Sequence, residues 1–159
     1  MKIEPQQVHL CAIEDDKTVV GVCVLVPPAA GGERIKMRQV AVAPTHQRQG
    51  IGGKVVEQFL SASSFSVVSH TLYLSLSLLL HCCNCQLMRA AAVEAKRRGH
   101  AVLYCHARAT AQEFYAALGY ATVSDRFEEV GIPHYRMELD LNNINENGAS
   151  LPKDGDLDS

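Results

Sequence analysis

The sequence lacks an excess of charge of either sign. Its 159 residues include 15 Lys and Arg against 17 Asp and Glu, a formal net charge of -2. Nucleic acids and membrane surfaces select proteins with a basic excess on one face, so the charge gives no reason to expect either partner. We therefore expect a small partner molecule, and neither nucleic acid nor membrane.

The beginning of the sequence also lacks an apolar segment of the kind that directs secretion, because charged Lys2 and Glu4 lie within its first four residues. The six cysteines are then expected to be reduced thiols, and the cytoplasm is the expected compartment. With 47% hydrophobic and 20% charged residues, the composition is that of one globular domain that buries a core without metals or disulfides.

Two segments predict strands. The first, TVVGVCVLV at residues 18–26, lies between a charged turn and two prolines. In the second, RIKMRQVAV at 34–42, the apolar residues shift from odd to even positions at Arg38 and Gln39. Side chains alternate between the faces of a strand, so this shift predicts a β-bulge.

The later segments alternate between helix and strand patterns. In order, they predict a helix from Met88 to a stop at Gly99, a buried strand over 101–107, a helix over 110–120, and strands over 120–127 and 134–141. Thr110 is the expected N-cap of the second helix, and Gly119 its expected end. Residues 142–159 are polar and rich in turn formers, so we expect a disordered tail after a domain over 1–141.

A glycine loop follows the second strand, in QVAVAPTHQRQGIGGK. Gly50, Gly52 and Gly53 precede a helical pattern, so backbone N–H groups and a helix N-terminus would point at one place, which suits a pyrophosphate. The P-loop pattern is excluded, because Arg48 and Val55 stand where it needs Gly and Ser or Thr. Val55 also occupies the third glycine position of the dinucleotide-binding fingerprint.

This loop resembles the acyl-CoA loop of the GNAT N-acetyltransferase superfamily, whose signature Q/R-x-x-G-x-G/A is matched by Gln47, Gly50 and Gly52. QEFYAALGY, ending at Tyr120, resembles that superfamily's A-x-x-F-Y-x-x-x-G-F/Y helix. FEEVGIPHYRMEL resembles the E-x-G-I-P-H-x-x-M ending of the ElaA-like branch, as does His106-Ala107 at a strand end. The resemblance covers most of residues 18–60 and 88–141. It implies an α/β (α+β) fold with a mixed, mostly antiparallel twisted sheet flanked by helices.

The resemblance implies an N-acetyltransferase that moves an acetyl group from acetyl-CoA to a primary amine on a small molecule or peptide, without a metal. Two central strands would separate to admit the pantetheine arm, which backbone groups of Val40, Ala41 and Val42 would bind. The pyrophosphate would be held by the loop residues Gln47, Arg48, Gln49, Gly50, Ile51, Gly52 and Gly53. A neutral amine would attack the thioester, and a backbone donor would stabilise the oxyanion.

Tyr115 is the general acid that the resemblance implies. A phenol with a pKa of about 10 can protonate a thiolate whose conjugate acid has a pKa of about 8.5 or above. The alternative is that Tyr115 and Phe114 are only core side chains of an amphipathic helix. A general base must also accept the amine's proton, and four candidates stay open: His106, His134, Glu128 and Glu129.

The stretch from Gln58 to Met88 contains no charged residue. At about 1.5 Å per residue a helix of that length could cross a bilayer. A crossing would leave the glycine loop and Tyr115 on opposite sides of the membrane, so we expect none. Four soft metal ligands also occur here, but no second cysteine pair with C-x₂₋₄-C spacing follows, so we expect no metal. These ligands are His81, Cys82, Cys83 and Cys85.

We interpret about residues 61–87 as an apolar insert in the helix that the resemblance places after the glycine loop. Its Ser, Leu, Phe and Cys share pyrimidine-rich codons, so we hypothesise a retained intron or a mis-predicted exon. Abundant message that contains the segment, with no shorter form, would contradict this.

The resemblance also places a strand and one or two helices before the strand at 18–26, whereas this sequence begins almost at that strand. An alternative to an enzyme is therefore a non-catalytic CoA-binding or interaction module, inactive because of the missing N-terminal elements and the insert.

Overall fold

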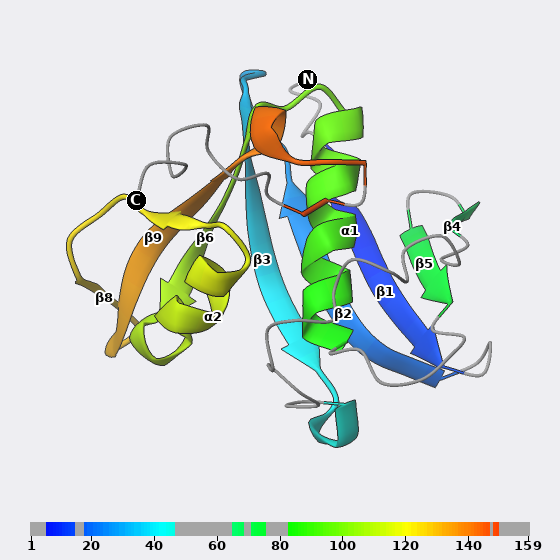
Figure 1. The fold of residues 1–159 in the computed structure, drawn as a ribbon, viewed down its shortest axis with the longest axis horizontal. Helices are drawn as coiled ribbons and strands as arrows, with labels where there is room; N and C mark the ends of the chain where they lie inside the picture. The colour runs from blue at the N-terminus through cyan, green and yellow to red at the C-terminus, as the bar shows by residue number, and fades with distance from the viewer. Residues whose placement is uncertain are drawn as a thin grey trace, which may run out of the picture.

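The computed structural model describes residues 6–14, 18–46, 65–68, 71–75, 83–146 and 148–149. These residues form one nine-stranded sheet in the order β4-β5-β1-β2-β3-β6-β9-β7, with β8 beside β9 (Figure 1). The strands are β1 (Val8–Glu14), β2 (Thr18–Val26), β3 (Arg34–Val42), β4 (Phe65–Val68), β5 (Thr71–Ser75), β6 (Val102–Arg108), β7 (Ala121–Thr122), β8 (Phe127–Glu129) and β9 (Ile132–Asp140). All neighbours pair antiparallel except β1 with β5 and β3 with β6. The predicted mixed, mostly antiparallel sheet is confirmed.

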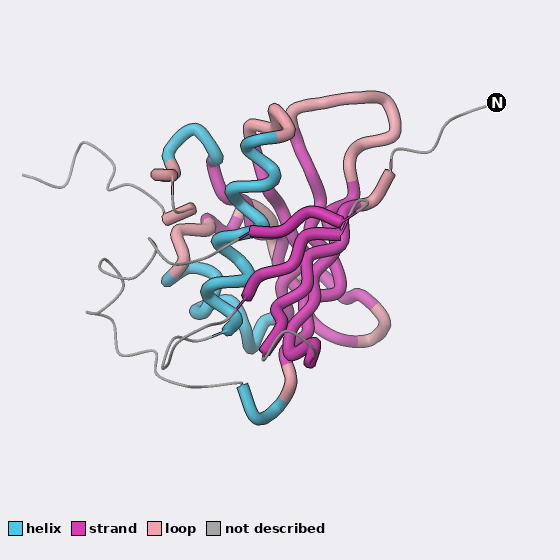
Figure 2. The backbone as a smooth tube through the Cα atoms, turned by 90° about the vertical axis from the view of Figure 1, so that its right-hand side faces the viewer, coloured by secondary structure: helices cyan, strands magenta, loops and turns pink. Residues whose placement is uncertain are grey.

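Both α-helices lie against the same face of this sheet. Helix α1 (Cys83–Arg97) covers β1, β2 and β3, and α2 (Gln112–Ala117) covers β6 and β7. The view along the sheet in Figure 2 shows the helices on one side and the strands on the other. In the part of the chain that the structure describes, no α-helix lies on the opposite face, which is called the open face below.

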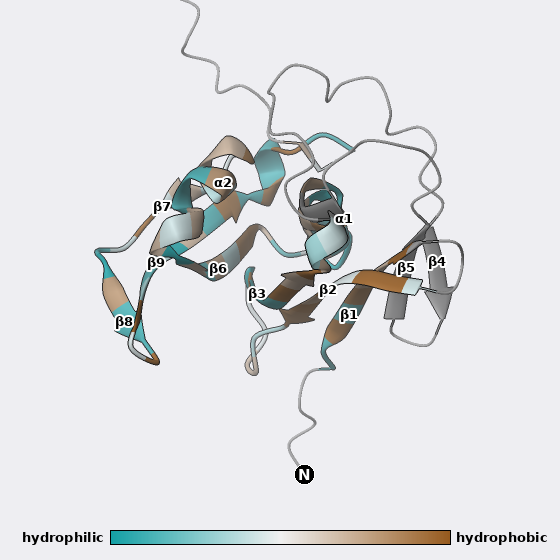
Figure 3. Ribbon diagram, turned by 90° about the horizontal axis from the view of Figure 1, so that it is seen from below, coloured by the Kyte–Doolittle hydropathy of each residue, from teal (hydrophilic) through white to brown (hydrophobic). Residues whose placement is uncertain are grey.

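Strand β1 was missed by the sequence prediction, which placed the first strand at 18–26. Its alternation is clear in the structure: Val8, Leu10 and Ala12 are buried against the core, and His9 is exposed. Figure 3 shows β1 and β2 coloured as mainly hydrophobic. Leu, Cys, Ala and His occupy positions at which β-branched residues would favour a strand more strongly, so the local sequence pattern predicted this strand only weakly.

Helix α1 begins at Cys83, earlier than the predicted Met88. Leu87, Ala91 and Ala95 are fully buried along one stripe of the helix. Residues 83–87 of the expected insert therefore belong to this helix, while β4 and β5, also within the expected insert, extend the sheet beside β1. The predicted stop is confirmed, because Gly99 has φ 84° and the next amide, of His100, donates to the Ala95 carbonyl at 3.2 Å.

Glu94 of α1 is the one charged side chain that is buried within the described residues. It accepts hydrogen bonds from Arg97 Nε and Nη2, both at 2.8 Å, and from Arg98 Nε at 2.5 Å. Burial by itself raises the pKa of Glu94, but the hydrogen bonds and charges of the two arginines outweigh burial, and the pKa is lowered.

We expect Glu94→Gln to lower the free energy of unfolding by about 1.5 kcal/mol. This value is at the low end of the range for hydrogen bonds to charged groups, because both arginines are partly exposed to solvent. Because the folded-state pKa is depressed, this stabilisation is complete above the ordinary carboxyl value of 4.5 and is lost as the pH falls through the lower folded value. Urea unfolding at several pH values measures it. Glu33→Gln, at an exposed carboxylate, is the control, and an equal change in both variants would contradict the prediction.

The predicted β-bulge in β3 is confirmed. Val22 of β2 pairs with Ala41 and Val24 with Arg38, so Gln39 and Val40 together stand opposite one residue of β2. Gln39 has φ 53°, a left-handed conformation that is uncommon for residues with a side chain. The bulge therefore changes the direction of the backbone of β3 just before its last residues.

The predicted N-cap at Thr110 is wrong. The chain leaves β6 through a 3₁₀ turn, η3 (Ala109–Ala111), so Thr110 lies inside that turn and the residue before α2 is Ala111, without a side-chain cap. The predicted end is confirmed, because Gly119 has φ 90°.

The segment predicted as one strand over 120–127 forms two short strands, β7 and β8, that pair with different parts of β9. Between them the Ser124 hydroxyl accepts a hydrogen bond from the backbone N–H of Arg136 at 2.8 Å, in place of a ladder partner. Part of the expected tail is also packed: Ile144 is buried, and its carbonyl accepts from Lys96 Nζ at 3.0 Å. The described chain therefore remains ordered beyond residue 141.

Candidate functional site

The two central strands β3 and β6 pair over only part of their length. Their parallel ladder joins Arg34 to Val102, Ile35 to Leu103 and Lys36 to Tyr104, and it ends there. Both strands continue past the last pair, β3 to Val42 and β6 to Arg108, and Figure 1 shows them diverging toward their C-terminal ends. An extended group can therefore bind between the two strands without breaking a ladder, as the resemblance implied.

The bulge lies on this diverging part of β3. Val40 is half-buried and Ala41 is exposed, whereas the Val42 side chain is buried and pairs with Gly21 of β2. The predicted pantetheine-binding residues thus stand beside the separation of the two strands. The predicted pyrophosphate-binding residues, 47–53, lie outside the described residues, and their role stays a prediction.

Tyr115 lies on α2 and is 8% exposed. Its ring makes edge-on contacts with Phe114 and Tyr120, with centroids 5.3 and 5.4 Å away. Its hydroxyl forms a side-chain hydrogen bond with the Cys105 thiol of β6. Burial raises the pKa of Tyr115 well above its usual value, and the neighbouring Cys105 and Cys23 add to that shift. The phenol therefore keeps its proton through the physiological pH range.

The surroundings of Tyr115 are polar but uncharged. Burial raises the pKa of Cys105 and of Cys23 to about 12, so both are thiols at neutral pH. The Tyr120 hydroxyl is buried, and among the described residues it has no hydrogen-bond partner. Sequence reasoning missed Cys105 and Tyr120, because neither residue type nor spacing distinguishes them from ordinary core residues.

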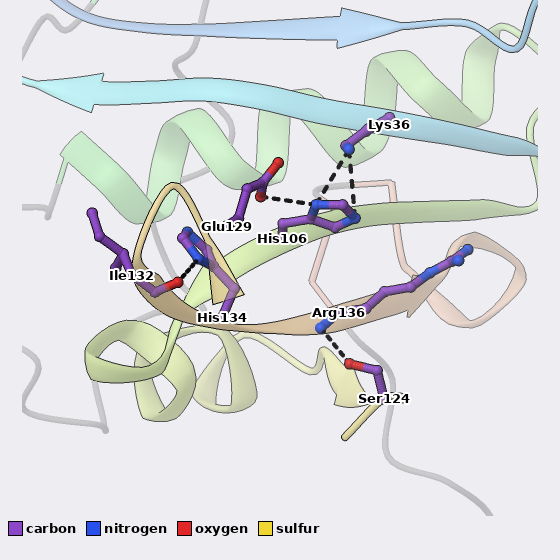
Figure 4. A network of polar contacts seen from close by, with 7 residues as sticks. All are labelled: Lys36, His106, Ser124, Glu129, Ile132, His134 and Arg136. Atoms are coloured by element: carbon purple, nitrogen blue, oxygen red, sulfur yellow. Dashed lines mark hydrogen bonds and ion pairs between the residues drawn. The ribbon is translucent and has the colours of Figure 1, made fainter. Parts of the chain in front are cut away.

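His106 follows Cys105 on β6, so its side chain leaves the strand on the open face. Its Nδ1 lies 3.1 Å from Glu129 Oε2, and both ring nitrogens lie 3.4 Å from Lys36 Nζ (Figure 4). The hydrogen bond with His106 lowers the pKa of Glu129, which therefore stays ionised. A carboxylate beside Nδ1 favours the tautomer with its proton there, which leaves a lone pair on Nε2.

The other two candidate bases, His134 and Glu128, have different surroundings. His134 Nδ1 is 2.7 Å from the Ile132 carbonyl oxygen, and its ring stacks on Phe127 at 6.1 Å. Glu128 is exposed, and within the described part of the chain no side-chain hydrogen bond or ion pair is recorded for it. The structure thus brings His106 and Glu129 together and leaves Glu128 apart.

Lys36 of β3 and Arg136 of β9 lie beside His106 on the open face, and Arg38 follows Lys36 on the same face of β3. His106 pairs with Arg136 across the β6–β9 ladder. Partial burial lowers the pKa of Lys36, and the charge of Arg38 lowers it further. The charge of Glu129 opposes this shift, and the charge of Arg136 adds to it. Sequence reasoning missed this group, because its members come from strands far apart in the chain; the alternating cations of β3 were the only local signal.

Over the described ranges, no group of three or more His, Cys, Asp and Glu is placed to hold a metal ion. His81 and Cys82, two of the soft ligands noted in the sequence, lie outside those ranges. No helix in the described residues has the length and apolar character needed to cross a membrane.

Comparison with known proteins gives two family matches. Two protein-family models, each described as an acetyltransferase (GNAT) domain, match residues 6–78 and 85–141. No curated protein matches the sequence.

Solved structures share the fold. An acyl-CoA N-acyltransferase from Pseudomonas aeruginosa is 18% identical with a TM-score of 0.53, over 84% of this chain and 68% of that one. Escherichia coli ElaA is 18% identical with a TM-score of 0.50, over 78% of this chain and 62% of that one. An aminoglycoside 6'-N-acetyltransferase complexed with coenzyme A is 14% identical with a TM-score of 0.56, over 88% of this chain and 76% of that one. The chain therefore spans less than two thirds of ElaA.

Proposed function

Because its two halves match GNAT acetyltransferase domains and its sheet has the GNAT fold, we propose that this chain transfers an acetyl group from acetyl-CoA to a primary amine of a small molecule or peptide. The observation that supports this most is the separation of β3 from β6 after Lys36 and Tyr104, beside the bulge at Gln39. A tyrosine and a histidine stand on opposite faces of the sheet at this separation.

The diverging strands fit the co-substrate that the fold family uses. Backbone groups from Val40 to Val42 would bind its pantetheine arm, and amides of 47–53 its pyrophosphate. When bound, acetyl-CoA supplies an acetyl group activated as a thioester. The chain's own contribution is mainly to position the two reactants and to exclude water.

Two side chains of this chain would move protons. His106 accepts the amine's proton at Nε2, while Glu129 holds the imidazole through Nδ1. Tyr115 holds a proton at its phenol oxygen for the departing thiolate, and Cys105 orients that hydroxyl. Because Cys105 and His106 are consecutive on β6, base and acid act from opposite faces of the sheet. Cytoplasmic location remains a prediction.

The test is calorimetric titration with acetyl-CoA, followed by release of free thiol in the presence of an amine panel. We expect stoichiometric binding, and about 2.7 kcal/mol of added stability at one hundred times the Kd. Thiol release should require both an amine and Tyr115. Binding without amine-dependent thiol release would favour the non-catalytic CoA-binding module, and absence of binding would contradict both functions.

A further inference from the structure

The cationic cluster of Lys36, Arg38 and Arg136 lies on the open face beside His106. Lys36 and Arg38 are two residues apart on β3, so their side chains leave on the same face, opposite the buried Met37. Arg136 is the cross-strand partner of His106. Lys36 stands at the last paired position of β3 and β6, and Arg38 stands beyond it. The cluster therefore surrounds the point where the two strands separate.

The protein balances the charges of this cluster only in part, because Arg136 is ion-paired and the charge of Glu129 also acts on Lys36. Glu129 is engaged by His106, and Glu138 is shared between Arg34 and Arg136 Nη2, which lies 2.9 Å away. Within the described residues, no carboxylate forms an ion pair with Lys36 or Arg38. Arg136 Nε is also buried there without a hydrogen-bond partner. Like charges held close together raise the free energy of the protein, and a bound anion would offset that cost.

The ring of Tyr104 contacts two of these cations, Lys36 and Arg136. The Arg136 guanidinium carbon lies 4.4 Å from the ring centroid, and Lys36 Nζ lies 5.9 Å from it. Tyr104 belongs to the last β3–β6 pair, so it orders two cations at the start of the separation. Two of the three positive charges, those of Lys36 and Arg136, are thus held beside an aromatic ring of the sheet, whereas Arg38 is exposed.

We propose that the amine acceptor contains an anionic group, a carboxylate or a phosphate, that binds the cationic cluster while its amine faces His106. This rests on the proposed function, because it assigns the acceptor of the same site. A cationic polyamine would be repelled by the cluster, and a neutral amine would gain nothing from it.

Acetyl transfer by the full chain to four amines tests the proposal: β-alanine with a carboxylate, O-phosphoethanolamine with a phosphate, neutral ethanolamine, and cationic putrescine. We expect kcat/KM to be at least about tenfold higher for one or both anionic amines than for ethanolamine, and to fall as salt is added. The first two amines show which anion is preferred. Transfer that is fastest with putrescine, or equal for all four, overturns this inference and leaves the proposed function intact. No transfer to any of the four amines also overturns this inference, and absence of acetyl-CoA binding by calorimetry overturns the proposed function as well.

Variants separate the cluster from general charge effects. In Arg38→Gln and Lys36→Met, the preference for the anionic amine over ethanolamine should fall about tenfold, the effect of one charge-assisted hydrogen bond. Arg97→Gln removes the same charge from α1 on the other face and should leave both the preference and the activity unchanged. A preference that survives both cluster variants, in protein that still binds acetyl-CoA by calorimetry, overturns the proposal.

Discussion

Tyr115→Phe should lower kcat for acetyl transfer about 100-fold, the lower end of the range for general acid catalysis. The substitution removes one oxygen atom from a side chain that is 8% exposed, and it keeps the ring contacts with Phe114 and Tyr120. Because the hydroxyl bonds the Cys105 thiol and no charged group, its loss should cost little stability. The measurement is free-thiol release under saturating acetyl-CoA and amine, together with the acetyl-CoA Kd by calorimetry, which should not change.

The pH dependence of kcat provides a second test of Tyr115. Burial raises the pKa of Tyr115 above its ordinary value of 10.0, so the acid stays protonated beyond that pH. We expect no alkaline fall of kcat below pH 10 that is due to Tyr115. Tyr135→Phe, at a partly buried tyrosine of β9, is the matched control and should retain full activity. Full activity in Tyr115→Phe would reassign Tyr115 to the core, the alternative that the sequence left open.

His106→Gln should lower kcat/KM by about 100-fold or more, as expected when a general base is removed. Glutamine can still donate to Glu129, so the local hydrogen bond is kept while the basic Nε2 is lost. Raising the pH should partly restore activity in this variant, because solvent then supplies neutral amine. Thiol release across a pH series measures both effects.

Neighbouring residues supply the controls for this assignment. Glu129→Gln should lower activity less, about tenfold, because it alters only the orientation and charge balance of the imidazole. Glu128→Gln removes the same charge one residue away at an exposed position and should have no effect. If His134→Gln abolishes thiol release and His106→Gln does not, the base is His134, which lies near the start of β9.

Local pattern predicted much of the fold. The shift of apolar positions at Arg38 and Gln39 predicted a bulge that the structure contains, and the glycines at 99 and 119 end helices as expected. Local pattern failed where the deciding contact was distant. Thr110 is not an N-cap, because the chain leaves β6 in a 3₁₀ turn that contains this residue. Helix α1 starts before Met88, because Leu87 packs into the core.

The order of side chains along the chain determined which residues face the core and where elements end, because alternation in strands and glycine conformations are local properties. Tertiary structure alone decided the candidate site. Lys36, His106 and Arg136 are separated widely in sequence and meet only through the hydrogen-bond registers of β3 with β6 and of β6 with β9. Those registers depend on which strands pair and on where the pairing stops, and no local pattern specifies either.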